Sequence, residues 1–496
     1  MTKKLFSFLV SLIQQVKSTE AKIALAKYCG TLASKNYCGS FRDRNIDAFF
    51  KSYARKNNKE FPSLKALDTN QIVHVFTTTY ITGGHTRFLE NLVQLDDCYV
   101  HHLLITDQGG IPARQSLFDI IQSKGGEVHL LPKNTLNEQI SAFQAFISEK
   151  ASKIMLHIHP HDILPSIALH NKPDVIEVLF FNHADHLFSY GCDVSTAIIN
   201  IREEAQRISV HERSMQHSYI LPLPIIKKEA STFNLSEIRE KYGVKESEII
   251  GLSIGNPAKF HKNKQHHFFK TINSALEQNP RLKIFIVGVN RADFCPELDV
   301  REHQRLEFLG TQKDPSELQR IADIAIDPMP FGSYTALLET CYYGAYPLVC
   351  YNTISLFNLY TDAAFNGKIS LDLTEESYLQ HLHQFCEGKL EFSKNDIADA
   401  VKETHAGSMW VKQLHHILSG KATDTTKNTP LPSDLSRFFE LNQPIKVIQY
   451  SALVFFYEHI HLFTRKEVLK IILHLTMNRY SRRETLGILK KSIQGK

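Results

Sequence analysis

The stretch Asp323–Cys350, DIAIDPMPFGSYTALLETCYYGAYPLVC, decides the fold of this chain. Its order predicts a short apolar strand, a loop, a helix and a second strand. Two prolines end the first strand, because proline lacks the backbone donor that a sheet requires. The helix is expected to begin at Thr335 and to stop at Gly344, and Tyr346–Cys350 is expected to be the next buried strand. The stretch is therefore predicted to be a βαβ unit.

Two polar residues of that helix indicate a ligand. Thr335 and Glu339 lie four residues apart and so share one helical face. The free N–H groups and the dipole of a helix N-terminus suit an anion such as a diphosphate, to which the Thr335 hydroxyl can add a hydrogen bond. A carboxylate one turn deeper suits a sugar diol. The pair is predicted to hold the phosphate and ribose of a nucleotide; the alternative is an ordinary βαβ unit with a capping threonine and a solvated glutamate.

This stretch resembles the donor-binding motif of GT-B glycosyltransferases, particularly the large retaining family 4. The residues that carry the resemblance are Gly332, Ser333, Tyr334, Thr335, Glu339 and the turn Gly344–Pro347. Many members have a second glutamate eight residues before the first, where this chain has Phe331. The resemblance implies transfer of a hexose-type sugar from a nucleotide diphosphate sugar to a glycan, lipid or protein acceptor. It implies no metal or other cofactor, and the retaining or inverting course stays open.

Composition places the chain in a broad class. Its 496 residues are 43% hydrophobic and 22% charged, as in a soluble globular protein of about two to four domains. A net charge of +5 does not indicate nucleic acid and is compatible with an anionic nucleotide. Eight scattered cysteines without CxxC pairs predict a reduced, cytoplasmic protein. The apolar stretch Leu5–Ile13 after two lysines mimics a signal peptide, but an N-terminal helix is preferred.

Strands and helices alternate twice, from Gln71 and again from Glu248, which predicts parallel, doubly wound sheets. The fold class is therefore α/β, with two Rossmann-like domains facing a cleft and helical extensions at both ends. In the first alternation Arg207–Val210 is expected to be the sixth strand. The predicted parts are a helical extension (1–68), an acceptor domain (69–225), a nucleotide-sugar domain (226–420) and a basic helical extension (421–496). The last part could contact a protein or a membrane surface; a solvated basic face is the plainer alternative.

Polar residues follow two strands of the first domain. Gly83 and Gly84 let the backbone approach a ligand closely and resemble the Gly-Gly loop of GT-B enzymes, which faces the transferred sugar and acceptor. The segment Asn182–His186 follows an apolar strand, at the edge where open α/β sheets bind ligands. A histidine or carboxylate there can exchange protons with the acceptor. The predicted catalytic residues are His85, His183 and Asp185, with Asp185 favoured as the base of an inverting enzyme, and the predicted binding residues include Gly83, Gly84, Thr86, Arg87 and Asn182.

A cationic loop begins the second domain. It runs from Gly255 to Lys264, and lysines placed opposite the helix at Thr335 would neutralise a departing diphosphate. Related enzymes carry an arginine where Asn256 stands, so Lys259, Lys262 and Lys264 compete for its role. We expect Gly255 to bind substrate and Lys259 and Lys264 to act in catalysis.

Two other classes of function stay open. The histidines His157 and His159 alternate along a predicted strand, and with His183 and Asp185 they could hold the metal of a hydrolase. The absence of the second glutamate is compatible with an inactive protein that only binds sugar nucleotides.

Overall fold

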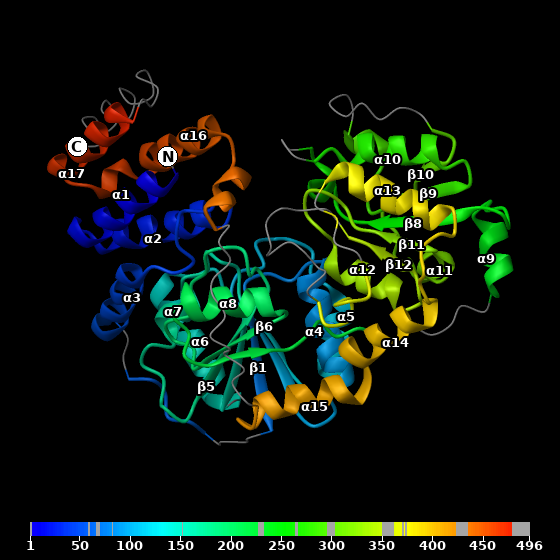
Figure 1. Ribbon diagram of the computed structural model, residues 1–496. Helices are drawn as coiled ribbons and strands as arrows, with labels where there is room; N and C mark the ends of the chain where they lie inside the picture. The colour runs from blue at the N-terminus through cyan, green and yellow to red at the C-terminus, as the bar shows by residue number, and fades with distance from the viewer. Residues whose placement is uncertain are drawn as a thin grey trace. The chain divides into compact units, whose positions relative to one another are not determined.

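The computed structural model describes residues 2–57, 60–65, 70–81, 83–150, 152–226, 233–262, 266–294, 303–349, 362–369, 372, 374–422 and 435–478. Two compact units make up the chain (Figure 1). The first unit comprises Met1–Asn200, Ala205–Ile220 and Thr423–Lys496, and the second comprises Ile201–Glu204 and Leu221–Ala422.

The first unit is built on a seven-stranded parallel sheet with the order β3-β2-β1-β4-β5-β6-β7. Its strands are β1 (Gln71–Phe76), β2 (Val100–Ile105), β3 (Val128–Leu130), β4 (Lys153–His157), β5 (Glu177–Asn182), β6 (Ala197–Asn200) and β7 (Ser218–Ile220). The connecting helices are α4 (Gly84–Leu95), α5 (Gln115–Ser123), α6 (Leu136–Lys150), α7 (Leu164–Ala168) and α8 (Glu203–His211).

The expected strand at Arg207–Val210 is wrong, because these residues belong to helix α8. Their β-branched and apolar side chains suit a strand, but Glu203 and Glu204 precede them. Acidic residues in the first turn stabilise a helix through its dipole, so the segment continues as a helix. The last two strands of this sheet, β6 and β7, flank that helix.

Helices from both ends of the chain join the hydrophobic core of the first unit. They are α1 (Thr2–Gln15), α2 (Thr19–Ala33), α3 (Arg44–Asn57), α16 (Ile445–His459) and α17 (Arg465–Met477), with short 3₁₀ turns at Leu435–Leu441 and Ile460–Leu462. Leu9, Leu25 and Ile471 from these helices share one hydrophobic core with Val73 and Leu156 of the sheet. Burial of apolar surface therefore fixes the terminal helices to this unit.

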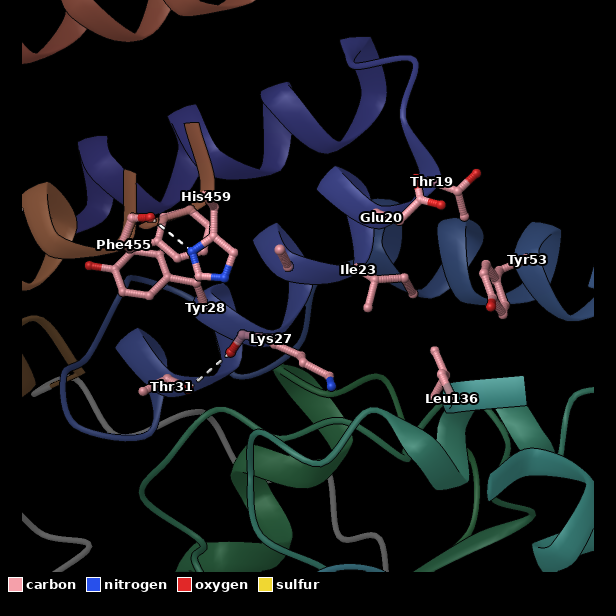
Figure 2. Close-up of a pocket in the computed structure, with 11 residues that line it drawn as sticks. Thr19, Glu20, Ile23, Lys27, Tyr28, Thr31, Tyr53, Leu136, Phe455 and His459 are labelled. Carbon is pink, nitrogen blue, oxygen red and sulfur yellow. Dashed lines mark hydrogen bonds between the residues drawn. The ribbon is translucent and has the colours of Figure 1, made fainter. Parts of the chain in front are cut away.

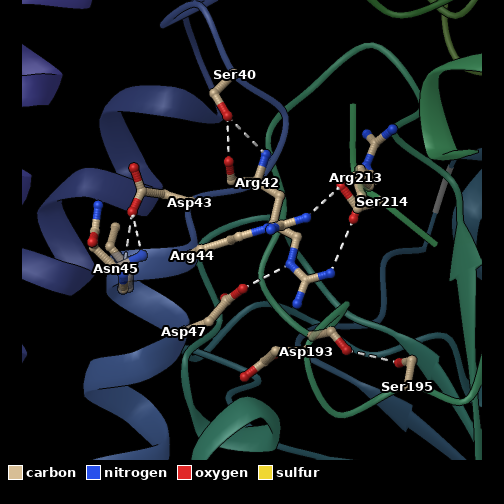
Figure 3. A network of polar contacts seen from close by, with 12 residues as sticks. Ser40, Arg42, Asp43, Arg44, Asn45, Asp47, Asp193, Ser195, Arg213 and Ser214 are labelled. Atoms are coloured by element: carbon tan, nitrogen blue, oxygen red, sulfur yellow. Dashed lines mark hydrogen bonds and ion pairs between the residues drawn. The ribbon is translucent and has the colours of Figure 1, made fainter. Parts of the chain in front are cut away.

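A polar network also holds α3 in place (Figure 3). The Arg42 guanidinium lies 2.7 Å from the Asp47 carboxylate and donates to the carbonyl of Arg213 at 3.0 Å. Nearby, Arg44 donates to the Ser214 hydroxyl at 3.0 Å. The start of α3 is thereby joined to the loop between α8 and β7.

The second unit contains a five-stranded parallel sheet with the order β10-β9-β8-β11-β12 (Figure 1). Its strands are β8 (Ile249–Ile254), β9 (Leu282–Val287), β10 (Leu306–Phe308), β11 (Ile324–Ile326) and β12 (Tyr346–Leu348). Its helices are α9 (Leu235–Lys241), α10 (Phe268–Gln278), α11 (Ser316–Ile321), α12 (Tyr334–Cys341), α13 (Glu375–Cys386), α14 (Lys394–His405) and α15 (Gly407–Leu418), with 3₁₀ turns at Pro257–Phe260 and Arg291–Phe294. The predicted α/β class, with two parallel sheets, is confirmed. Within the described residues, each helix is too short or too polar to cross a bilayer.

Candidate functional site

The strand order reverses once in each sheet. In the first sheet β1 lies between β2 and β4, and in the second β8 lies between β9 and β11. Open parallel sheets bind ligands outside the carboxyl ends of the strands at such a reversal. The loops after β1 and β4, and those after β8 and β11, are therefore the candidate sites. The sequence-predicted residues lie mostly on these loops and on the one after β5.

In the second unit, a buried carboxylate shapes the turn that leads into α12. Asp327 directly follows β11, and its Oδ1 accepts a hydrogen bond of 2.7 Å from the Ser333 backbone N–H. A Cβ atom at Gly332 would lie 2.4 Å from Asp327 Oδ2, so a larger residue there would displace the carboxylate. Helix α12 then begins at Tyr334 with Ser333 as its N-cap. The glycine loop predicted from the sequence is thus fixed by Asp327, whose role the sequence did not reveal.

The cationic loop meets the start of α12. The Lys259 ammonium donates a hydrogen bond to the Gly332 carbonyl oxygen. Burial lowers the pKa of Lys259, and the nearby Asp327 charge opposes that effect. A Cβ atom at Gly255 would lie 3.2 Å from Ser333 Oγ, so glycine allows the two loops to approach closely. The structure therefore brings together Gly255, Lys259 and the Gly332–Ser333 turn, whereas Lys264 lies outside the described residues.

The remaining residues of the predicted donor motif have different surroundings. The Tyr334 hydroxyl donates to the Asp362 carboxylate, which also lies 3.1 Å from His405 Nε2. Although burial acts to raise it, the pKa of Asp362 is lowered by His405 and by these hydrogen bonds. Thr335 and Glu339 are partly exposed, and Glu339 accepts a hydrogen bond of 3.4 Å from Gln319. Tyr334 is thus bound to the protein interior, while Thr335 and Glu339 remain accessible.

In the first unit, the predicted residues between β1 and α4 contact other residues of the same loop and of helix α4. Gly83 has φ +124°, a conformation that favours glycine, and Gly84 is the first residue of α4. Thr86 is buried and accepts a 2.9 Å hydrogen bond from the Tyr80 backbone N–H. The Arg87 guanidinium lies 3.3 Å from Glu90. Thr86, predicted to bind substrate, therefore supports the loop from inside.

Two predicted residues, one at the end of β5 and one in the loop after it, are also turned inward. Asn182 is buried and donates to Asn200 at 2.9 Å and to Ser209 at 3.3 Å. The Asp185 carboxylate is 3% exposed and lies 3.3 Å from His186 Nδ1. These two side chains are therefore occupied within the protein, and Asp185 is poorly exposed for the role of a base.

His85 and His183 do come together. Their rings lie 4.5 Å apart, centroid to centroid, in an edge-to-face arrangement. His85 Nε2 donates to the His157 carbonyl oxygen at 2.8 Å, which fixes its tautomer. Burial lowers the pKa of His85 to about 3 and holds the pKa of His183 well below its usual range. Two neutral imidazoles therefore meet at the carboxyl edge of the first sheet.

Behind His183 runs a chain of hydrogen-bonded histidines that the sequence did not reveal. His157 Nδ1 lies 2.7 Å from His183 Nε2, and His157 Nε2 lies 3.0 Å from His74 Nδ1. His74 Nε2 lies 2.9 Å from His101 Nδ1, and His101 Nε2 lies 3.3 Å from Asp96 Oδ2. The sequence feature that could have revealed the chain is the presence of a histidine in each of three predicted strands.

The same chain argues against the metal-hydrolase alternative. Both ring nitrogens of His157 face other histidines, so a metal at this residue would break a hydrogen bond of the chain. His159 Nε2 lies 3.2 Å from the Tyr80 hydroxyl. Each of the four proposed ligands thus has a protein partner where a shared ion would need it as a ligand.

The first unit also contains a pocket of about 490 Å³ that is lined by helices (Figure 2). Its walls come from α2, α3, α6 and α16, and Tyr28 of α2 stacks on Phe455 of α16 with ring centroids 4.3 Å apart. This pocket is lined by residues other than those at the strand ends, so it is separate from the site described above.

Comparisons with known proteins identify the fold. No protein-family model matches the sequence, and no curated protein matches it either. Solved structures do match. The HepE protein of Anabaena, in complex with UDP and glucose, has a TM-score of 0.53 at 13% identity, over 71% of this chain and 99% of that chain.

Two other solved structures agree with this result. The lipopolysaccharide outer core galactosyltransferase WaaB, in its apo form, has a TM-score of 0.50 at 12% identity, over 71% of this chain and 100% of that chain. A glycosyltransferase from Rickettsia africae has a TM-score of 0.50 at 12% identity, over 73% of this chain and 100% of that chain. The chain therefore has the GT-B fold, as the donor-binding motif predicted.

Proposed function

We propose that the protein is a glycosyltransferase that transfers a sugar from a nucleoside diphosphate sugar to a hydroxyl group of an acceptor. The observation that carries this proposal is the contact between Lys259 and the Gly332 carbonyl at the start of α12. It places a cation beside the N-terminus of a helix, at the reversal of the second sheet. That combination suits a diphosphate better than a neutral ligand.

The proposed roles in the second unit follow from position along α12. The N–H groups of its first turn, the Thr335 hydroxyl and the Lys259 ammonium bind the diphosphate and stabilise the charge that develops as it leaves. Glu339, one turn deeper and partly exposed, accepts hydrogen bonds from the ribose hydroxyls. The HepE structure contains UDP and glucose, which supports a nucleotide sugar as the donor.

The proposed roles in the first unit belong to His85 and His183. Both imidazoles are held neutral by burial, which lowers their pKa values, and a neutral imidazole can accept a proton or a hydrogen bond from a hydroxyl. His183 is the better candidate for the base, because the Asp185 carboxylate is buried beside His186. The acceptor is proposed to be a glycan, lipid or protein.

A thermal-shift screen against nucleoside diphosphates and nucleotide sugars tests the proposal. A matching nucleotide should raise Tm, and Lys259→Met should abolish most of the shift. Lys270→Met, which removes an exposed lysine of α10, is the matched control and should keep it. Failure of every nucleotide to stabilise the protein would contradict the proposal, and binding without release of diphosphate from any donor would indicate an inactive binding protein.

A further inference from the structure

The histidine chain crosses the first sheet as a diagonal. Residues that pair in a parallel sheet point to the same face, and His101 pairs with Ile72 while His157 pairs with Phe76. His74 lies between those two positions on β1. Each step along the chain therefore moves one strand sideways and two residues towards the carboxyl edge. The final step reaches His183, the residue after β5.

This arrangement differs from ordinary packing. The opposite face of the same strands contributes Val73, Leu104 and Leu156 to the large hydrophobic core. A buried imidazole is costly unless both of its ring nitrogens have partners. His74 and His157 each have histidine partners at both nitrogens, at 2.7–3.0 Å. A continuous polar path thus runs under one face of the sheet to its functional edge.

Asp96 determines which ring nitrogen of the first histidine, His101, carries the proton. Its Oδ1 accepts a 2.9 Å hydrogen bond from the Cys98 backbone N–H, and its Oδ2 faces His101 Nε2. This contact of 3.3 Å is an ion pair without hydrogen-bond geometry. A carboxylate oxygen repels a nitrogen lone pair at that distance, so His101 carries its proton on Nε2. The Lys124 ammonium donates to the Asp96 carbonyl at 3.0 Å and adds a positive charge beside this residue.

The orientation of one hydrogen bond fixes that of the next, because a neutral imidazole has one donor nitrogen and one acceptor nitrogen. His101 Nδ1 accepts from His74 Nε2, His74 Nδ1 accepts from His157 Nε2, and His157 Nδ1 accepts from His183 Nε2. His183 is left with a lone pair on Nδ1, which has no hydrogen-bond partner among the described residues. Burial, with neighbouring histidines, lowers the pKa values of His74, His157 and His183, which keeps these rings neutral.

We propose that Asp96, His101, His74 and His157 form a polarised relay that presents the Nδ1 lone pair of His183 to the hydroxyl of the acceptor. This inference rests on the proposed glycosyltransferase function. His183 is then the catalytic residue, since it touches the reacting hydroxyl, and the other four are positioning residues that act through it.

The proton balance of the step is complete. As the acceptor oxygen bonds to the anomeric carbon and the bond to the diphosphate breaks, the hydroxyl proton moves to His183 Nδ1. The Nε2 proton of His183 moves to His157, that of His157 to His74, and that of His74 to His101. The imidazolium of His101 is then paired with the Asp96 carboxylate, 3.3 Å away. The positive charge therefore ends on His101, beside the Asp96 carboxylate, rather than on an unpaired ring in the buried sheet. The reverse transfers restore the starting state when the proton leaves to solvent.

The variant Asp96→Asn tests the relay by reversing the orientation of its hydrogen bonds. The Cys98 N–H still requires an oxygen as its acceptor, so the amide NH₂ must face His101 Nε2. Every ring then reverses its tautomer, and His183 carries its proton on Nδ1. The control is His102→Gln, because His102 is the neighbouring residue on β2 and contacts Gln71 and the Glu127 N–H instead of the chain.

The measurement is ¹⁵N NMR of histidine-labelled, full-length protein, which distinguishes Nδ1–H from Nε2–H. We expect Nε2–H at His183 in the wild type and in His102→Gln, and Nδ1–H in Asp96→Asn. Nδ1–H at His183 in the wild type would overturn the relay, as would an unchanged tautomer in a folded Asp96→Asn. The wild-type result decides the question even if the variant does not fold.

Kinetics supply the second readout. Asp96→Asn should lower kcat by on the order of 10²-fold, the usual effect of losing acid–base assistance, with nucleotide affinity within threefold of wild type. Unchanged kcat in a variant with the reversed tautomer would overturn the relay. A wild-type protein that turns over no donor would instead contradict the proposed function, and the tautomers would still decide whether the chain is polarised.

Discussion

The two units share a parallel α/β architecture but carry different chemistry at their sheet reversals. In the second unit the functional groups are fixed: a glycine turn held by Asp327, the start of α12 and the Lys259 ammonium. In the first unit they are neutral imidazoles linked to one another. Fixed dipoles and an ammonium group suit an anion that must be held, whereas linked neutral rings suit a proton that must move. The comparison agrees with our proposal that one unit binds the nucleotide and that the other carries the proton chemistry.

The largest expected effect comes from removing the last ring of the histidine chain. His183→Ala should lower the rate of sugar transfer by about 10²–10⁴-fold, the range for loss of a general base. His217→Ala, which removes an exposed histidine of the same unit, should have no effect. Steady-state assays of diphosphate release measure both. Transfer by His183→Ala within threefold of wild type would remove proton chemistry from the first unit.

Loss of the fixed cation should come next. Lys259→Met should lower turnover by on the order of 10²-fold, because a preorganised charge at the leaving group is lost. The same assay with saturating donor separates this effect from weaker binding. Normal turnover would show that the leaving diphosphate is stabilised by other groups.

Removing the proposed ribose contact should affect binding more than chemistry. Glu339→Ala should weaken the affinity for a nucleoside diphosphate by about 2–3 kcal/mol, the scale of a hydrogen bond to a charged group. Glu376→Ala, at an exposed acidic position of α13, serves as the control. Equal calorimetric affinities in folded protein would exclude Glu339 from the site.

The smallest effect is on stability, and it belongs to the first unit. Burial lowers the pKa of His85 to about 3, whereas an unfolded histidine titrates near pH ~6.5. Below that pH the unfolded chain binds a proton that the folded chain excludes, so stability falls as pH falls, by about 1.4 kcal/mol per pH unit for each such histidine. His85→Asn should make the stability less dependent on pH by the contribution of one proton, about 1.4 kcal/mol per pH unit. His217→Asn should leave the dependence unchanged.

Urea titrations between pH 7 and 5 measure this slope, and two probes separate the units. The single tryptophan, Trp410, is buried in the second unit and donates to the Pro222 carbonyl, so its fluorescence reports that unit. Hydrogen exchange at β1 and β4 reports the first. Equal acid sensitivity of both probes, unchanged in His85→Asn, would contradict the assignment of this effect to the buried histidines.

Predictability from sequence also differs between the units. The donor motif was predictable because Gly332, Thr335 and Glu339 lie within eight residues, where helical geometry alone places them. The histidine chain was not, because His74 and His101 meet only through the register of two strands that are far apart in sequence. His85 and His183 were both predicted to be catalytic, which stays a prediction, and the structure places their rings 4.5 Å apart.

Some residues that were predicted to bind substrate instead make hydrogen bonds within the protein, and the sequence could not reveal these partners either. Asn182 and Thr86 have the right chemistry at the right strand ends, but burial and hydrogen bonds within the protein decide where their side chains point. Such partners come from distant residues such as Asn200, so a local pattern does not reveal them. The same applies to Arg207–Val210, where strand-like side chains follow an acidic helix start.

The division of labour between the units is tested most directly by calorimetric titration of one nucleoside diphosphate into three proteins: wild type, His183→Ala and Lys259→Met. The account predicts that His183→Ala binds the nucleotide with a Kd within threefold of wild type. Lys259→Met should bind at least about tenfold more weakly, since a charge-assisted hydrogen bond contributes more than 1.4 kcal/mol. Wild-type affinity in Lys259→Met together with lost binding in His183→Ala would contradict it.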